Sequence, residues 1–315
     1  MSVEQSIEAA PQVLAASRQP KPDSPAGLWL QRHLPALVLS PSLVAIGIFV
    51  YGFIVWTFYL SFTRSKILPV YAWAGTEPHQ RLWSTPNWYK ALENLAIFGS
   101  LYILICLALG LFLAILIDQK IRGESLFRPV FLYPMALSFI VTGTAWKWFL
   151  NPGYGLQKTV QDWGWTGFTF DWITSTDMAI YTVVIAGVWQ VSGFIMAMFL
   201  AGLRGIDGDM LRAAQIDGAS TFNTYRRIVI PQLRPIFLSA FVVLAHMAIK
   251  SYDLVVALTG GGPGNATELP ATFMYSYTFT RNQMAIGAAS AVVMLAIIAA
   301  VIIPYLYLEL REKKP

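Results

Sequence analysis

The ionisable residues best placed for chemistry lie inside a long apolar stretch. His246, Lys250 and Asp253 stand at positions i, i+4 and i+7, and Tyr252 precedes Asp253. On one continuous helix this spacing puts the three ionisable groups on the same face. Burying such a group in a membrane is costly, so its presence indicates a functional site. The cluster could relay protons or bind a polar solute, and Lys250 and Asp253 could instead form a structural ion pair.

A second aromatic and polar pair, Trp189 and Gln190, lies near the middle of another apolar run. We predict that this pair and the His246 cluster face the same pathway, with packing or a subunit interface as the alternative for Trp189. Lys147 stands between Trp146 and Trp148, near the end of its run. Snorkelling of its ammonium group toward the membrane surface explains this position.

Several other kinds of chemistry are excluded by what the sequence lacks. The three histidines, His33, His79 and His246, are far apart, and the single cysteine, Cys106, lies inside an apolar run. We therefore expect no metal site and no disulfide. The sequence has no G-x-x-x-x-G-K-[ST] loop, so a nucleotide would have to be bound by a partner. The basic residues are dispersed over short loops, which argues against nucleic acid, and no nucleophile–base arrangement indicates an enzyme.

These residues must be positioned by helices that cross a membrane. Only 12% of the 315 residues are charged, against about 25% in an average soluble domain, and the mean hydropathy is +0.55. Six runs approach the ~20 apolar residues that span a bilayer: Leu43–Phe62, Leu95–Ile117, Val130–Leu150, Ala179–Leu203, Ile236–Leu258 and Met284–Leu306. Backbone groups in lipid must bond within their own segment, so we predict an all-α integral membrane protein with six transmembrane helices.

The basic residues outside these runs predict the orientation of the chain. Fourteen lysines and arginines fall on the side that holds both termini, and six fall on the other side. The positive-inside rule then places both termini in the cytoplasm. We predict a flexible cytoplasmic tail at 1–33, a transmembrane domain at 34–308 and a second cytoplasmic tail at 309–315. The longest cytoplasmic loop is 204–235.

This loop reads as two short helices. Asp207 is a plausible N-cap and Asp209 places negative charge in the first turn of one helix. Gly218 supplies permissive backbone geometry where that helix breaks. The stretch "TFNTYRRIVI" carries apolar residues opposite arginines and predicts a second helix, which Pro231 and Pro235 should end. An amphipathic helix resting on lipid headgroups is the alternative reading.

The stretch "AAQIDGASTFNTYRRIVIPQLRP" resembles the cytoplasmic EAA loop of binding-protein-dependent ABC importer permeases. In that family the loop forms a coupling helix that docks into a cleft on a separate ATPase subunit. The resemblance carries this role to Ala213, Ala214, Asp217, Gly218, Ala219, Phe222 and Pro231. Arg212 stands where the family has a glutamate, so we do not expect here an ion pair of the kind which that glutamate makes with the ATPase.

The stretch "LTGGGPGNATELPATFMYSYTF" is similar to a signature of the carbohydrate branch of these permeases. It resembles the first-type permease of a heterodimeric pair, as in maltose, glycerol-phosphate and glucose importers. Gly261, Gly262 and Pro263 would then shape an outer gate. For a sugar, Tyr252 and Trp189 offer aromatic faces for C–H surfaces, while Gln190, His246, Lys250 and Asp253 offer groups for hydroxyls.

The resemblance implies a permease subunit of an ATP-driven importer in the bacterial inner membrane, carrying glucose, mannose or a short oligosaccharide. It implies no enzyme activity and no cofactor on this chain, because ATP and Mg would be bound by the ATPase. The implied partners are a homologous second permease, two ATPase subunits, an extracytoplasmic sugar-binding protein and membrane lipids. A transporter driven by an ion gradient, an ABC permease for amino acids or peptides, and a structural membrane protein are the alternatives.

Overall fold

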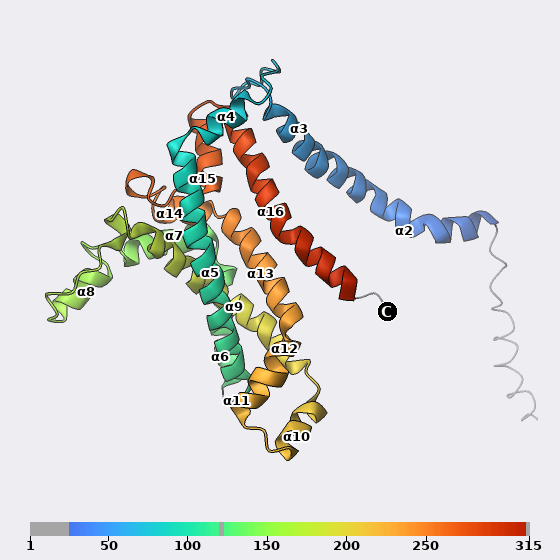
Figure 1. The fold of residues 1–315 in the computed structure, drawn as a ribbon, viewed down its shortest axis with the longest axis vertical. Helices are drawn as coiled ribbons and strands as arrows, with labels where there is room; N and C mark the ends of the chain where they lie inside the picture. Colours follow the sequence, from blue (N-terminus) through green and yellow to red (C-terminus); the bar gives the residue numbers. More distant parts are fainter. Residues whose placement is uncertain (1–24, 120–122, 313–315) are drawn as a thin grey trace, which may run out of the picture. The chain divides into compact units, whose positions relative to one another are not determined.

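The computed structural model describes residues 25–119 and 123–312, which are predominantly helical (Figure 1). Within these ranges there is no β-strand, only an isolated bridge between Thr63 and Trp73. The prediction of an all-α protein is confirmed. Of the predicted tails, residues 1–24 and 313–315 lie outside these ranges, whereas 25–33 and 309–312 belong to helices.

The chain divides into two units, Met1–Trp56 and Thr57–Pro315. In the first unit α2 (Pro25–Ile46) continues through a π-helical stretch, Gly47–Gly52, toward α3 (Phe53–Leu60). A candidate membrane span covers Val38–Leu60, which overlaps the predicted Leu43–Phe62.

In the second unit α9 (Ala179–Arg204) is the most buried of the candidate membrane spans, with 72% of its most apolar segment buried. It packs along α5 (Pro86–Asp118), and Ile195, Met196 and Phe199 are fully buried in the resulting core. The last long helix is α16 (Met284–Glu312). The predicted spans Leu95–Ile117, Ala179–Leu203 and Met284–Leu306 lie within these three helices, so their existence and approximate limits are confirmed.

The third predicted span, Val130–Leu150, is wrong as a single helix. It consists of α6 (Glu124–Ala136) and α7 (Phe139–Phe149), which meet at an angle of 99°. Ser138 has extended backbone geometry and its hydroxyl accepts from Val141 N, so it starts α7 as an N-cap. The helix α6 lies directly against α9, because a Cβ at Gly193 would be 1.8 Å from the backbone oxygen of Phe131.

The fifth predicted span, Ile236–Leu258, is also wrong as a single helix. It contains α13 (Arg234–Ile249) and α14 (Asp253–Leu258), separated by three residues without helical structure of their own. Before α13, helical backbone runs from Thr221 to Gln232 and meets α13 at 63°. Among the described residues four helices are long and apolar enough to cross a membrane, and the number rises to six if each bent pair counts as one span.

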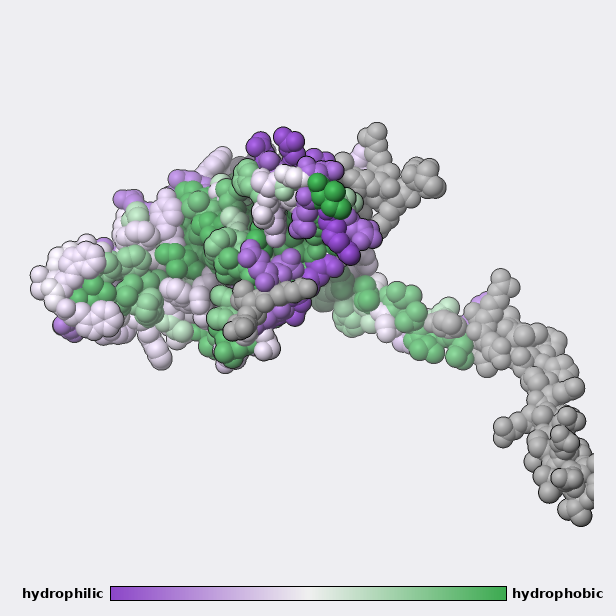
Figure 2. All heavy atoms as spheres, turned by 90° about the horizontal axis from the view of Figure 1, so that it is seen from below, coloured by the Kyte–Doolittle hydropathy of each residue, from purple (hydrophilic) through white to green (hydrophobic). Residues whose placement is uncertain are grey.

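The remaining helices connect these spans. They are α4 (Glu77–Trp83), α8 (Leu156–Asp162), α10 (Gly208–Ile216), α11 (Thr221–Thr224), α12 (Ile230–Gln232) and α15 (Pro270–Tyr275). The view in Figure 2 looks onto the end of the second unit that carries α10 and α11. Hydrophilic side chains gather there, while apolar side chains dominate beside them (Figure 2). This end therefore has the polarity of a surface in water.

Candidate functional site

The break between α13 and α14 opens onto a cavity of about 120 Å³. Four of the six predicted pathway residues line it: His246, Lys250, Tyr252 and Asp253. Aromatic rings from other helices complete the wall, namely Phe98 and Tyr102 of α5 and Phe139 of α7, with Gly187 of α9 beside them. The cavity thus combines aromatic faces with charged and hydrogen-bonding groups.

The expected helical face is wrong, although the residues do meet. The helix α13 ends at Ile249, and Lys250 is its C-cap, so His246, Lys250 and Asp253 do not share one helix. Asp253 instead opens α14 and places its negative charge in the first turn of that helix. The three groups converge because the backbone turns around the cavity. The spacing of these residues predicted neither the break between α13 and α14 nor the contribution of the aromatic rings of α5.

Tyr252 and the two charged residues beside it remain available to a solute. The ring of Tyr252 packs on Tyr275, with 4.9 Å between ring centroids. Lys250 and Asp253 are exposed, and neither forms an ion pair with any residue in 25–119 or 123–312. The alternative of a Lys250–Asp253 ion pair within the chain is therefore not realised.

Trp189 and Gln190 lie on α9 but do not line this cavity. Trp189 is 41% exposed and packs edge-on against Trp146, with centroids 5.9 Å apart. Gln190 is buried, and its Nε2 donates to the backbone oxygen of Leu137 at 2.9 Å. The amide thus satisfies a carbonyl group in the break between α6 and α7. A pathway role for this pair stays a prediction.

The loop 204–235 begins with a well-capped helix. The Asp207 side chain accepts from Asp209 N at 2.8 Å, which confirms the predicted N-cap of α10. At the other end Gly218 has φ +75°, Gly218 N donates to Gln215 O, and Ala219 N donates to Ala214 O. These two bonds form a Schellman motif, so the predicted break at Gly218 is confirmed.

One face of α10 points away from the rest of the chain. Arg212 and its partner Asp209, 3.1 Å apart, are 75% and 82% exposed. Ile216 is 86% exposed and Phe222 of α11 is 71% exposed, whereas Ala214 faces inward. Large exposed apolar side chains at the polar end of the unit indicate a partner surface.

The prediction that Pro231 and Pro235 end the second helix is confirmed for the region, because the helix ends at Gln232, but Pro231 itself does not stop it. Helical backbone continues from α11 through a π-helical stretch, Tyr225–Val229, into α12. Pro231 lies inside this continuous helical backbone, in α12 directly after the π-helical stretch, so its missing N–H interrupts the hydrogen-bond pattern without ending the helix. The bend comes after Gln232, next to Pro235 in the first turn of α13.

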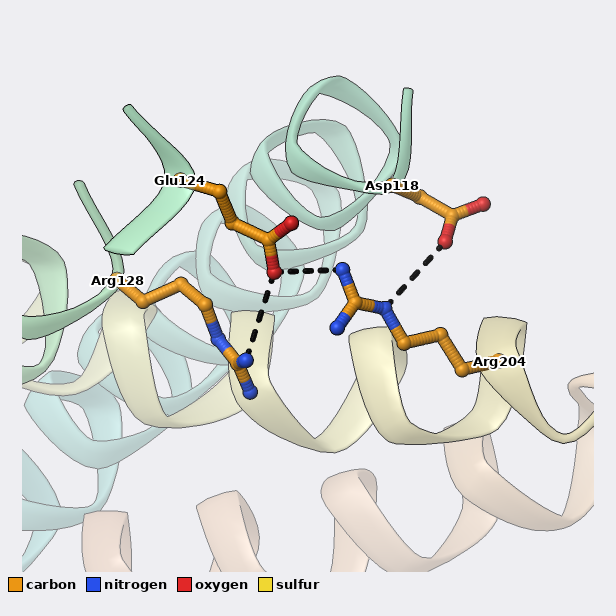
Figure 3. Close-up of polar contacts among 4 residues, drawn as sticks. All are labelled: Asp118, Glu124, Arg128 and Arg204. Atoms are coloured by element: carbon orange, nitrogen blue, oxygen red, sulfur yellow. Dashed lines mark hydrogen bonds and ion pairs between the residues drawn. The ribbon is translucent and has the colours of Figure 1, made fainter. Parts of the chain in front are cut away.

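Three helix ends meet at Arg204, where α9 gives way to this loop (Figure 3). The guanidinium lies 2.6 Å from Glu124 Oε1 at the start of α6 and 3.7 Å from Asp118 Oδ1 at the end of α5. Arg128 also contacts Glu124, at 3.4 Å. From the sequence, Arg204 was recognisable only as one of the basic residues of this side. The acidic residues that flank the chain connection between α5 and α6 were the available signal.

The glycine-rich segment after α14 has the geometry expected of a tight turn. Gly260, Gly261 and Gly262 all have positive φ, and a Cβ at Gly262 would be 2.8 Å from Thr267 Oγ1. Glu268 follows and is buried, and its Oε2 has no hydrogen-bond partner among the described residues. Burial raises the pKa of this carboxyl above its usual range, and the charge of Arg281 opposes the shift.

Residues 106–314 match the protein family described as "Binding-protein-dependent transport system inner membrane component". The chain belongs to this family. A probable ABC transporter permease protein of Pyrococcus horikoshii is 43% identical to this permease over 273 residues, 86% of this chain and 94% of the relative. The xylose/arabinose import permease protein of Haloferax volcanii is 38% identical over 273 residues, 85% and 86% of the two chains.

The fold agrees with this assignment. A crystal structure of a bacterial ABC transporter involved in the import of alginate aligns with a TM-score of 0.78. The alignment covers 91% of this chain and 99% of the other, at 18% sequence identity. The protein is a permease subunit of an ABC importer, a multi-pass membrane protein and not an enzyme.

Proposed function

We propose that this permease imports a sugar or a short oligosaccharide, and that the cavity at the break between α13 and α14 lies on its path. The convergence of Tyr252, Lys250, Asp253 and His246 on one cavity carries the proposal. Sugars bind through C–H faces that pack on aromatic rings and through hydroxyls that need donors and acceptors. Both kinds of group line this space. The import of pentoses by a relative at 38% identity supports the same substrate class.

The energy would come from a separate ATPase. The exposed face of α10 and α11, with Arg212, Ala213, Asp217, Gly218 and Phe222, would dock into a cleft on that subunit. The loop that carries α10 and α11 begins at the ion pairs of Arg204 and ends at the bend before α13. A displacement of α10 can therefore reach α5, α6 and α13. ATP and Mg would be held by the partner, and this chain would supply no nucleotide site.

The family description implies an external binding protein that delivers the solute. We place the termini and the loop 204–235 in the cytoplasm, on the excess of basic residues on that side. A homologous second permease would complete the pathway, and Gly261, Gly262 and Pro263 would lie at the outer end of that pathway. Trp189 would face either the contact between the two permeases or the solute pathway.

The test is uptake in vesicles that contain the full complex, across a panel of pentoses, hexoses and short oligosaccharides. Tyr252→Ala and Asp253→Asn should raise the substrate concentration for half-maximal uptake by about 10-fold, the loss of one good contact. Tyr133→Ala is the matched control, since Tyr133 is exposed on α6 and does not line the cavity. Unchanged uptake in both cavity variants would contradict the proposal. Uptake driven by a proton gradient without ATP would favour the rival mechanism.

A further inference from the structure

A second cavity, of about 310 Å³, lies beside α4 and the start of α16, at the opposite end of the second unit from α10 (Figure 1). Its charged wall comprises Arg64, Lys66, Arg81 and Glu77, and its amide wall comprises Asn282 and Gln283. The remaining lining includes Ala285 and Ile286 of the first turn of α16. Figure 1 shows α4, which carries Glu77 and Arg81, beside this end of α16.

The shape of the cavity is fixed by hydrogen bonds between distant segments. Ile67 N donates to Asn282 Oδ1 at 2.7 Å, and Ala285 N donates to Ser65 O at 3.0 Å. Ser65 is buried, and its hydroxyl bonds to Thr63 Oγ1 and Val70 O. The loop that carries Arg64 and Lys66 is therefore anchored against the start of α16.

The charge in this cavity is not balanced by the chain. Glu77 accepts from Arg64 at 2.9 Å, which pairs one cation with the one carboxylate. Lys66 and Arg81 form no ion pair with any residue that the structure describes. The N-terminus of α16 adds partial positive charge, and its first turn has no acidic residue. The cavity thus carries positive charge that no described residue neutralises.

Two observations place this cavity at the membrane boundary. The first candidate span ends at Leu60 and the last begins at Met284, so both walls follow directly from membrane helices. Beside the cations, Ile67, Leu68 and Val70 are 47%, 80% and 49% exposed. Exposed apolar side chains next to unpaired cations match the boundary between acyl chains and phosphates.

We propose that this cavity binds the phosphate of an anionic phospholipid headgroup, with Lys66 and Arg81 as its ligands and Ile67, Leu68 and Val70 against the acyl chains. The site lies away from the transport cavity and the loop 204–235. It would hold the first outer loop and the start of α16 to one lipid while other helices move.

The experiment is native mass spectrometry of the full complex, titrated with phosphatidylglycerol or with zwitterionic phosphatidylcholine. Wild-type complex should retain phosphatidylglycerol preferentially. The variant Lys66→Gln/Arg81→Gln should bind it about 30-fold more weakly, the effect of two basic residues near an anionic surface. The matched control is Lys90→Gln/Lys158→Gln, which removes the same charge at two lysines that lie outside the cavity and already pair with Glu93 and Asp162, and it should bind phosphatidylglycerol as wild type does.

Equal phosphatidylglycerol binding by wild type and the double variant would overturn the proposal. An equal loss in Lys90→Gln/Lys158→Gln would also overturn it, because the attraction would then be unspecific. Displacement of the lipid by inorganic phosphate alone would identify a site for a free anion. If the double variant kept its lipid but lost stimulation by the external binding protein, the surface would belong to that protein and the lipid assignment would fail.

Discussion

Gly218 offers a test of whether α10 docks against a partner. Its φ of +75° lies in the left-handed region, and a Cβ added there would meet nothing within 4 Å in this chain. An alanine at this position therefore brings only backbone strain, about 1–2 kcal/mol. If this strain is the only effect on the coupling of ATP hydrolysis to transport, it lowers the fraction of molecules whose loop 204–235 has the native conformation by about 5- to 30-fold. Asparagine tolerates the left-handed region better than alanine but has the larger side chain.

Backbone strain and contact with a partner therefore predict opposite orders of transport for Gly218→Ala and Gly218→Asn. If α10 docks backbone-first into an ATPase cleft, Gly218→Asn should transport less than Gly218→Ala, because its amide enters space that the partner occupies. The assay is solute taken up per ATP hydrolysed in vesicles, with the amount of permease in the membrane measured for each variant. Gly218→Asn retaining more coupling than Gly218→Ala would refute the docking of this face.

Two further predictions concern stability. Arg204→Ala leaves Asp118 and Glu124 without their shared cation. It should lower the free energy of unfolding by about 1 kcal/mol, since each partly exposed pair contributes at most about that. Arg128→Ala removes only the 3.4 Å pair with Glu124 and should lower the melting temperature less in the same thermal-shift assay. Glu268 holds its proton to higher pH when folded than when unfolded, so its contribution is full below the ordinary pKa of 4.5 and is lost as the pH rises through the folded value. Glu268→Gln should therefore be more stable than wild type at neutral pH and lose this advantage in acid, and a constant difference between pH 4 and 8 would contradict this.

The sequence was sufficient for the straight spans and insufficient for the broken ones. Hydropathy located α9 almost to the residue, because a helix in lipid must be long, apolar and internally bonded. Hydropathy carries no information on the direction of the helix axis, so α6 and α7, which meet at 99°, were predicted as one span. Local signals were present, since Pro134 lies within α6 and Ser138 is a typical N-cap residue.

The site was predictable in its residues and not in its shape. The rarity of charge inside apolar runs singled out Lys250 and Asp253 correctly as members of one cluster. Their spacing suggested a helical face, whereas the chain leaves the helix at Ile249. The rings of Phe98 and Tyr102 carry no signal in a sequence rich in aromatic residues, because only tertiary packing brings α5 to the break.

The contact at Gly193 restricts how this protein can change shape. The carbonyl oxygen of Phe131 occupies the place where any residue other than glycine at position 193 would have its Cβ atom. The main chains of α6 and α9 are therefore in direct contact. Such a contact has no flexible side chains to absorb sliding. A displacement that starts at the base of α9 would carry α6 along as a single stiff piece, and the 99° corner between α6 and α7 would become the point where the motion changes direction.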